Sequence, residues 1–176
     1  MNPPEQRVRH RTIPTVPLVP PRPIPVSGPV IPDPRRFNPA YFSGDALPQL
    51  AEHFFRQAAE ENDHAMRFIK YVVDTGGRVV IPAIDAPQPT FKTAEEAIKL
   101  SLDREVEVTH QINALVELAR SENDFITNNF LQWFLTEQLE EVSSMDTLLK
   151  IVQRGADNLL SVEEYLARVG VKAAAP

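Results

Sequence analysis

The chain has 176 residues, of which 43% are hydrophobic and 24% are charged, enough for one compact domain with a single core. It contains no cysteine, which excludes disulfide frameworks, thiolate zinc sites, iron–sulfur clusters and cysteine nucleophiles, so any metal site must use carboxylates and histidine. The net charge of −6 disfavours nucleic acid and anionic membranes as partners and favours cations.

The first 43 residues differ in composition from the rest. They hold 12 of the 17 prolines and six arginines against two acidic residues, a net charge of +4, whereas residues 44–176 carry −10. Proline at this density breaks helices and central strands, so residues 1–43 are predicted to form an extended or disordered arm. No apolar stretch is long enough for a membrane span or a signal sequence, and the expected location is therefore cytoplasmic.

Residues 44–170 are predicted to form one helical domain, followed by a disordered tail at 171–176. The apolar residues of 47–74 recur at helical spacing, and a pair of glycines follows them, which predicts a long helix. Residues 76–92 are rich in proline and glycine and have no helical period. They predict a long connection that can cross a bundle from end to end.

Three further helices are predicted after this connection. The second helix of the domain begins at Thr93, where Thr93 and Glu96 form a capping box, and runs to Ala119. The third begins near Asp124 and stops at Gly155, and a short fourth covers 158–169. No repeat or alternating strand pattern is present, so the fold class is all-α: a bundle of three long helices and one short C-terminal helix.

Ionisable residues occupy inward positions on all three long helices. Glu61 and His64 lie one turn apart on the first helix, a spacing at which both side chains can hold one ion. The others are Glu105 on the second helix and Glu137, Gln138 and Glu141 on the third. Buried carboxylates without partners are costly, and no Lys or Arg lies on these stripes, so a bound cation is expected. Iron, manganese or zinc suits oxygen and imidazole ligands without thiolate.

The other acidic and histidine residues have simpler interpretations. His53 and His110 are expected on the surface, and Glu163 and Glu164 on the solvated face of the last helix.

Three stretches of the chain resemble the bacterial ferritins, which are iron-storing four-helix bundles. They are residues 60–65 (EENDHA), 103–106 (DREV) and 129–141 (NFLQWFLTEQLEE), and the resemblance extends over residues 45–169. It implies a ferritin-like bundle with a non-haem di-iron site and no haem. It also implies a ferroxidase, which oxidises Fe(II) with dioxygen and stores ferric mineral in a homo-oligomeric shell of about 24 subunits.

The resemblance also implies roles for individual side chains. Glu61 would bridge two irons, His64 would bind one of them and Glu105 the other. Gln138 would hydrogen-bond the ligand on the oxygen side. A third, peripheral iron site would use four acidic residues, which are Glu60, Glu137, Glu140 and Glu141.

The chain departs from the family where a long first helix should supply a Glu ligand and a nearby Tyr. Tyr41 and Phe42 resemble the last turn of that helix. Counting back from them, the two positions fall near Gly28 and Arg35, and neither residue can replace the family's side chains. Three long helices would then leave an apolar groove where the fourth should pack.

Two explanations are open for residues 1–43. They are an evolved arm that docks on a partner or covers the groove, or the product of a shifted or misassigned start, because shifted reading of GC-rich DNA yields proline and arginine. The abrupt change of pattern near Ala40 favours the second.

Two other functions stay open beside iron storage with ferroxidase activity. One is a catalytically impaired structural subunit, which binds iron or co-assembles with an intact ferritin paralogue. The other is an interaction module whose arm binds a polyproline-recognising domain or nucleic acid.

Overall fold

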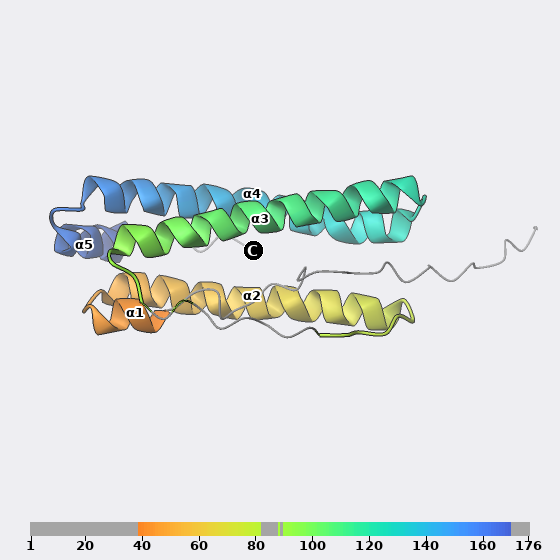
Figure 1. Ribbon diagram of the computed structural model, residues 1–176, viewed down its shortest axis with the longest axis horizontal. Coiled ribbons are helices and arrows are strands. Elements are labelled where there is room, and N and C mark those ends of the chain that lie inside the picture. The colour runs from red at the N-terminus through yellow and green to blue at the C-terminus, as the bar shows by residue number, and fades with distance from the viewer. Residues whose placement is uncertain (1–38, 82–87, 89, 170–176) are drawn as a thin grey trace, which may run out of the picture.

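A computed structural model describes residues 39–81, 88 and 90–169 of the chain. Within them, five helices follow one another (Figure 1), with bounds α1 Pro39–Gly44, α2 Pro48–Asp74, α3 Ala94–Ser121, α4 Phe125–Arg154 and α5 Leu159–Val169. The predicted all-α bundle of three long helices and a short C-terminal one is confirmed. No helix in this part of the chain has the length and apolar character needed to cross a bilayer.

Helix α1 corrects the prediction for residues 1–43. The last five of these residues were expected to be extended, yet Pro39 starts a short helix. Proline is tolerated at the first helical position because the N–H that it lacks has no partner inside the helix. Phe42 of α1 is buried and stacks on Phe54 of α2 at 4.8 Å between ring centroids. The rest of the predicted arm and the tail at 171–176 lie outside the described residues.

The ends of the long helices follow the predicted signals closely. The Thr93 hydroxyl accepts from the Glu96 N–H (3.1 Å), while the Glu96 carboxylate accepts from the Lys92 N–H (2.8 Å), one residue before the donor that the capping box predicts. Asp124 caps α4 by accepting from the Thr127 N–H at 2.9 Å. Helix α2 has Pro48 at its start and no side-chain cap from its own first residues.

Helices α2 and α3 run parallel. The last residue of α2 and the first residue of α3 lie at opposite ends of the bundle (Figure 1). A tight turn at 122–124 joins α3 to α4, which run antiparallel and pack against each other along their lengths.

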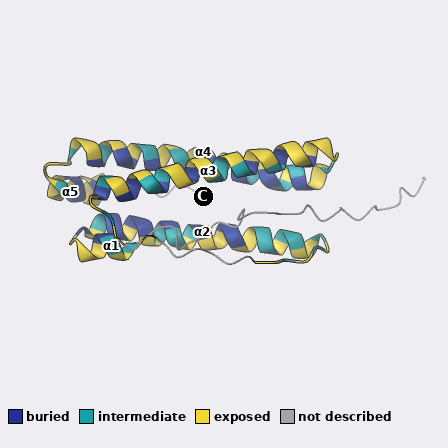
Figure 2. Cartoon of the chain, in the orientation of Figure 1, coloured by how far each residue is buried: buried dark blue, intermediate teal, exposed yellow. Residues whose placement is uncertain are grey.

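Two apolar clusters fill the interior, one toward each end of the bundle. The first combines residues from all five helices, including Leu50, Ile98 and Met145, which are fully buried at 0% exposure. The second contains Val116, Ala119 and Leu131 of the α3–α4 pair. Figure 2 shows the buried residues along the facing sides of the helices. Buried polar residues of α2, α3 and α4 lie between the two clusters.

Helix α5 closes the end of the bundle near α1. Its apolar residues Val162 and Leu166 join the first cluster. Glu163, which was predicted to face solvent, is buried instead: its carboxylate accepts from the backbone N–H groups of Gln49 (2.6 Å) and Leu50 (3.0 Å) at the start of α2. Glu164 is exposed, as predicted.

Candidate functional site

A layer of polar side chains crosses the middle of the bundle. We call it the polar layer, and its members are Gln57, Glu61 and His64 of α2, Glu105 of α3, and Gln138 and Glu141 of α4. Each of the six is between 3% and 6% exposed. Carboxylates buried to this extent require partners, because isolated charges are costly away from water.

Helical periodicity explains how the layer forms. Gln57, Glu61 and His64 are spaced by four and then three residues, so they follow one stripe of α2. Gln138 and Glu141 are spaced by three on α4. The apolar residues on the same stripes bury these positions on either side, which carries the polar side chains inward with them.

His64 lies between carboxylates from two helices. Its Nδ1 is 3.6 Å from Glu61 Oε1 and its Nε2 is 3.7 Å from Glu137 Oε1 of α4. Burial lowers the pKa of His64, but Glu61, Glu137 and Glu141 together outweigh burial and raise it. The imidazole therefore sits in a site of negative potential, where a cation is favoured.

Glu141 shows the effect of gathering these carboxylates. Burial raises its pKa, and the negative charges of Glu105, Glu61 and Glu60 raise it further, to about 8. The Gln57 amide donates to both Glu141 oxygens, at 3.2 and 3.0 Å, and to Glu60 at 2.9 Å. At neutral pH and without a bound cation, the Glu141 carboxyl group is mostly protonated.

Gln138 links α4 to α3 inside the layer. Its amide donates to the backbone carbonyl of Glu105 at 3.0 Å and to the Thr109 hydroxyl at 3.2 Å. The Glu105 carboxylate lies 3.4 Å from the same amide nitrogen, a long contact. Gln138 thus orients the backbone that carries Glu105.

The structure brings most of the predicted site residues together. Glu61, His64, Glu105, Gln138 and Glu141 are all in the polar layer. The remaining three lie toward solvent beside it, with Glu60 and Glu137 half-buried and Glu140 exposed.

Two residues next to the predicted set differ from expectation. Gln57 was missed, although it lies four residues before Glu61 on the same stripe. His53 was predicted on the surface, but it is buried one helical turn before Gln57 on α2. His110 is exposed, as predicted. Burial, helped by the charge of Arg56, lowers the pKa of His53 to about 4, so its imidazole is neutral. Its Nδ1 lies 3.3 Å from the Arg56 guanidinium.

The donor atoms of the polar layer are of the kinds that bind a hard or borderline cation. Its donors are carboxylate oxygens, an imidazole and amides, without sulfur, a set that fits iron, manganese or zinc. In the described residues, no three acidic or histidine side chains converge tightly on a single point. A bound cation would therefore have to draw the carboxylates closer to one point. Its positive charge would offset the repulsion between them.

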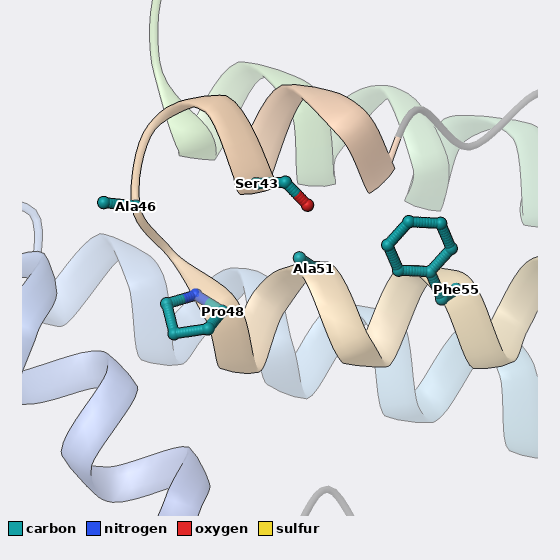
Figure 3. A pocket seen from close by; sticks show the side chains of 5 residues that line it. All are labelled: Ser43, Ala46, Pro48, Ala51 and Phe55. Atoms are coloured by element: carbon teal, nitrogen blue, oxygen red, sulfur yellow. The ribbon is translucent and has the colours of Figure 1, made fainter.

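A separate recess lies outside the polar layer. It encloses about 520 Å³ between α1 and the start of α2, and its lining residues are uncharged (Figure 3): Ser43, Ala46, Pro48, Ala51 and Phe55. It offers no carboxylate or imidazole, so it is not a candidate for cation chemistry.

Comparison with known proteins points to one family. Residues 39–155 match the ferritin-like domain that defines the ferritin family. The chain is 46% identical over 128 residues to ferritin BfrB of Mycolicibacterium smegmatis, covering 73% of this chain and 71% of that protein. It is 34% identical over 133 residues to the bacterial non-heme ferritin of Staphylococcus aureus, covering 76% and 80%. Among solved structures, an open pore ferritin from Archaeoglobus fulgidus matches with a TM-score of 0.70 and 33% identity, over 73% of this chain and 81% of that one.

Proposed function

Because the chain belongs to the ferritin family, whose members store iron, we propose that it binds Fe(II) in the polar layer, oxidises it with dioxygen and helps to store the ferric product in a shell. The observation that carries this proposal is the buried set of Glu61, His64, Glu105 and Glu141, contributed by three helices. The family itself was expected from the sequence, and that expectation is confirmed.

The positions in the layer support distinct roles toward two Fe(II) ions. Glu61 lies on the central stripe of α2 and can bridge both ions. His64, one turn later, would bind one ion, and Glu105 on the facing helix would bind the other. Gln138 would hold Glu105 in place through the backbone contact described above.

The acidic residues at the solvent side support a third, peripheral iron position. Glu137 lies 3.7 Å from His64 and is half-buried, so it can link this position to the polar layer. Glu60 and Glu141 share the Gln57 amide as a hydrogen-bond donor. Glu140 is exposed and would complete the position from solvent.

Oxidation of two Fe(II) ions supplies two electrons. Dioxygen takes up these electrons and two protons, which yields two Fe(III) and one hydrogen peroxide. A Glu141 carboxyl group with a pKa of about 8 can release a proton at neutral pH when a cation binds beside it. The layer itself thus supplies a proton as iron enters.

A second candidate function follows from the length of α1. In the described residues, only this six-residue helix precedes α2, at the place of the family's long first helix. The positions near Gly28 and Arg35, where that helix would carry its Glu and Tyr, lie outside the described residues. A subunit with half of the paired site would bind iron slowly or weakly and would depend on co-assembly with an intact ferritin paralogue.

Iron oxidation by the purified chain tests the proposal. Fe(II) is added without oxygen, dioxygen is then admitted, and the rise of ferric absorbance is followed. The wild-type chain is compared with a Glu61→Ala, His64→Ala variant and with a control, Glu117→Ala, His110→Ala, which removes the same residue types from exposed positions on α3. A wild-type rate above the first variant and equal to the control supports the ferroxidase. Equal rates in all three, with iron still bound, point to the impaired subunit.

A further inference from the structure

Gln57 connects the polar layer to its solvent side. It is 4% exposed and lies about one turn before Glu60 on α2. Its amide nitrogen is 2.9 Å from Glu60 Oε2, and 3.2 and 3.0 Å from Oε1 and Oε2 of Glu141. Glu60 is half-buried, whereas Glu141 is 6% exposed. The amide therefore stands between a carboxylate at the boundary of the layer and a carboxylate inside it.

Both protons of this amide are in use. A glutamine amide nitrogen carries two protons, and it accepts no hydrogen bond. With three oxygens around it, one proton points to Glu60 and the other is shared by the two oxygens of Glu141. The amide thus offsets the repulsion between the two side chains, as a small cation at the same point would.

A cation cannot bridge Glu60 and Glu141 while the amide is in this place. A divalent cation such as Zn(II) binds carboxylate oxygens at about 2.0–2.2 Å, closer than the amide nitrogen stands, and the partial positive charge of the two N–H groups would repel it. An ion that passes from Glu60 to Glu141 must therefore displace the amide. The cost is the loss of its hydrogen bonds to both side chains.

An ion that reaches Glu141 is among the ligands of the polar layer. Glu141 is close enough to Glu105 and Glu61 for their negative charges to act on it. A second approach leads past Glu137, which lies 3.7 Å from His64 and has no Gln57 contact among the described hydrogen bonds. The position of Gln57 therefore affects one of two approaches, and the test must distinguish them.

We propose that Gln57 is a positioning residue that controls the passage of cations between Glu60 and the polar layer. It holds the two carboxyl groups together when no ion is present, and it is displaced when an ion moves from one to the other. The proposal rests on the proposed function for the identity of the ion as Fe(II). The hydrogen bonds themselves would oppose any divalent cation in the same way.

Co(II) tests this control without any oxidation step. Trp133 is the one tryptophan of the sequence, and its ring lies 5.3 Å from the His64 ring, so Co(II) should quench its fluorescence on entering the layer. The full-length chain is mixed with Co(II) without oxygen in a stopped-flow instrument. The slow phase of quenching gives the rate of passage, and equilibrium dialysis gives the number of ions bound per chain.

Two substitutions at Gln57 should change this rate in opposite directions. Gln57→Ala removes the amide and leaves the passage open, so the slow phase should become faster by about tenfold, the effect of one hydrogen bond to a charged group. Gln57→Glu places a third carboxylate at the same point. It should retain one additional Co(II) per chain and slow the passage by a similar factor. Damage to the packing alone would change both rates in the same direction.

Gln153 gives the matched control. Its amide donates to the Glu95 carboxylate at 2.8 Å on the surface, twelve residues after Glu141 on the same helix and thus about 18 Å away. Gln153→Ala and Gln153→Glu should change neither the rate nor the number of ions. Changes of the same sign in both Gln57 variants would overturn the proposal. Rates equal to that of the wild-type chain would overturn it as well, and would indicate entry past Glu137.

Fe(II) separates failure of this proposal from failure of the proposed function. The chain is mixed with Fe(II) and dioxygen at the same moment, so that iron must enter before it is oxidised. Faster oxidation in Gln57→Ala and slower oxidation in Gln57→Glu are expected. If iron is oxidised equally fast in all three chains, Gln57 does not control entry although the proposed function stands. If the Co(II) results hold but no iron is oxidised, the proposed function fails while Gln57 controls the passage of another cation.

Discussion

At the scale of single residues, Glu141 shows how burial changes the chemistry of an ordinary side chain. Its carboxyl group is surrounded by Glu105, Glu61 and Glu60, and its pKa of about 8 lies above the ordinary value of 4.5. The folded chain therefore holds a proton there that the unfolded chain releases at neutral pH. Stability and cation binding are linked through this proton.

We predict that Glu141 makes the iron-free chain less stable as pH rises. Between about pH 4.5 and 8 the folded state binds more protons at this group than the unfolded state, so the free energy of unfolding falls through that window and levels off above it. Glu141→Gln removes the titration and keeps an acceptor for Gln57. It should raise stability at pH 8 by on the order of 1–3 kcal/mol, with little effect near pH 4.5.

Urea unfolding of both proteins at several pH values measures this difference. The comparison isolates Glu141, because other titrating groups such as His53 are common to both chains. A difference in stability that is the same at pH 4.5 and pH 8 would contradict the prediction.

Part of the candidate site could be predicted because helical spacing depends on local sequence alone. Glu61, His64 and Glu105 stand on inward stripes, and the structure buries them there. His53 and Glu163 could not be predicted in the same way, since the partners that bury them come from distant parts of the chain. The backbone donors of Glu163 are more than a hundred residues away.

At the scale of helices, Glu163 substitutes for a missing cap. Helix α2 has no side-chain cap of its own, and the Glu163 carboxylate of α5 accepts from two of its first N–H groups. We predict that Glu163→Ala leaves these donors without a partner and lowers the free energy of unfolding by about 1–3 kcal/mol. Thermal unfolding measures the loss. The neighbouring exposed residue gives the control, because Glu164→Ala should change stability little, and equal effects of the two substitutions would argue against the cap.

The contact between α4 and α5 depends on a glycine. A Cβ atom at Gly155 would overlap Val162 Cγ2, well inside van der Waals contact. We predict that Gly155→Ala destabilises the chain by about 1–3 kcal/mol, and that adding Val162→Ala recovers part of the loss by making room. Chemical unfolding of the single and double variants measures the coupling.

Gly44→Ala provides the matched control for Gly155→Ala, since a methyl group added at Gly44 would have no neighbouring atom within 4 Å. Loss of stability at both glycines alike would indicate a general backbone effect in place of a clash.

Helix boundaries were predictable where a cap stands in the sequence, and less so elsewhere. Thr93 and Asp124 mark the starts of α3 and α4 within a residue. The α1 helix was expected only through the resemblance of Tyr41 and Phe42 to the last turn of a longer helix, because the proline content of the preceding segment predicted an extended arm. Its stability comes from Phe42, which packs in the core against a helix that follows it.

At the scale of the whole molecule, α2 carries an apolar surface that the other described residues leave uncovered. Phe55, Met66 and Val73 are each more than half exposed, although their helix is otherwise amphipathic. Large apolar side chains on one helix commonly mark a surface that another chain covers. The family's shell provides such a partner surface.

We therefore predict that the purified full-length chain forms a closed assembly of about 24 copies. Light scattering coupled to size exclusion measures its mass at physiological and at high salt. The mass should be unchanged at high salt, because apolar contacts are not screened by ions. A monomer, or a mixture of sizes, would show that this chain alone does not build the shell and would favour co-assembly with a longer paralogue.

The bond between Glu163 and the start of α2 also bears on how fast the chain folds. It joins residues 113 positions apart, whereas α3 and α4 meet through a turn of three residues. Closing a long loop is slow relative to forming a helical hairpin, so the α3–α4 pair should be structured in the folding transition state and the α2–α5 contact should not. In stopped-flow experiments, Glu163→Ala should then speed unfolding and leave the folding rate unchanged, while Leu131→Ala in the hairpin should slow folding. The helix that closes the bundle would be the last to dock and the first to leave.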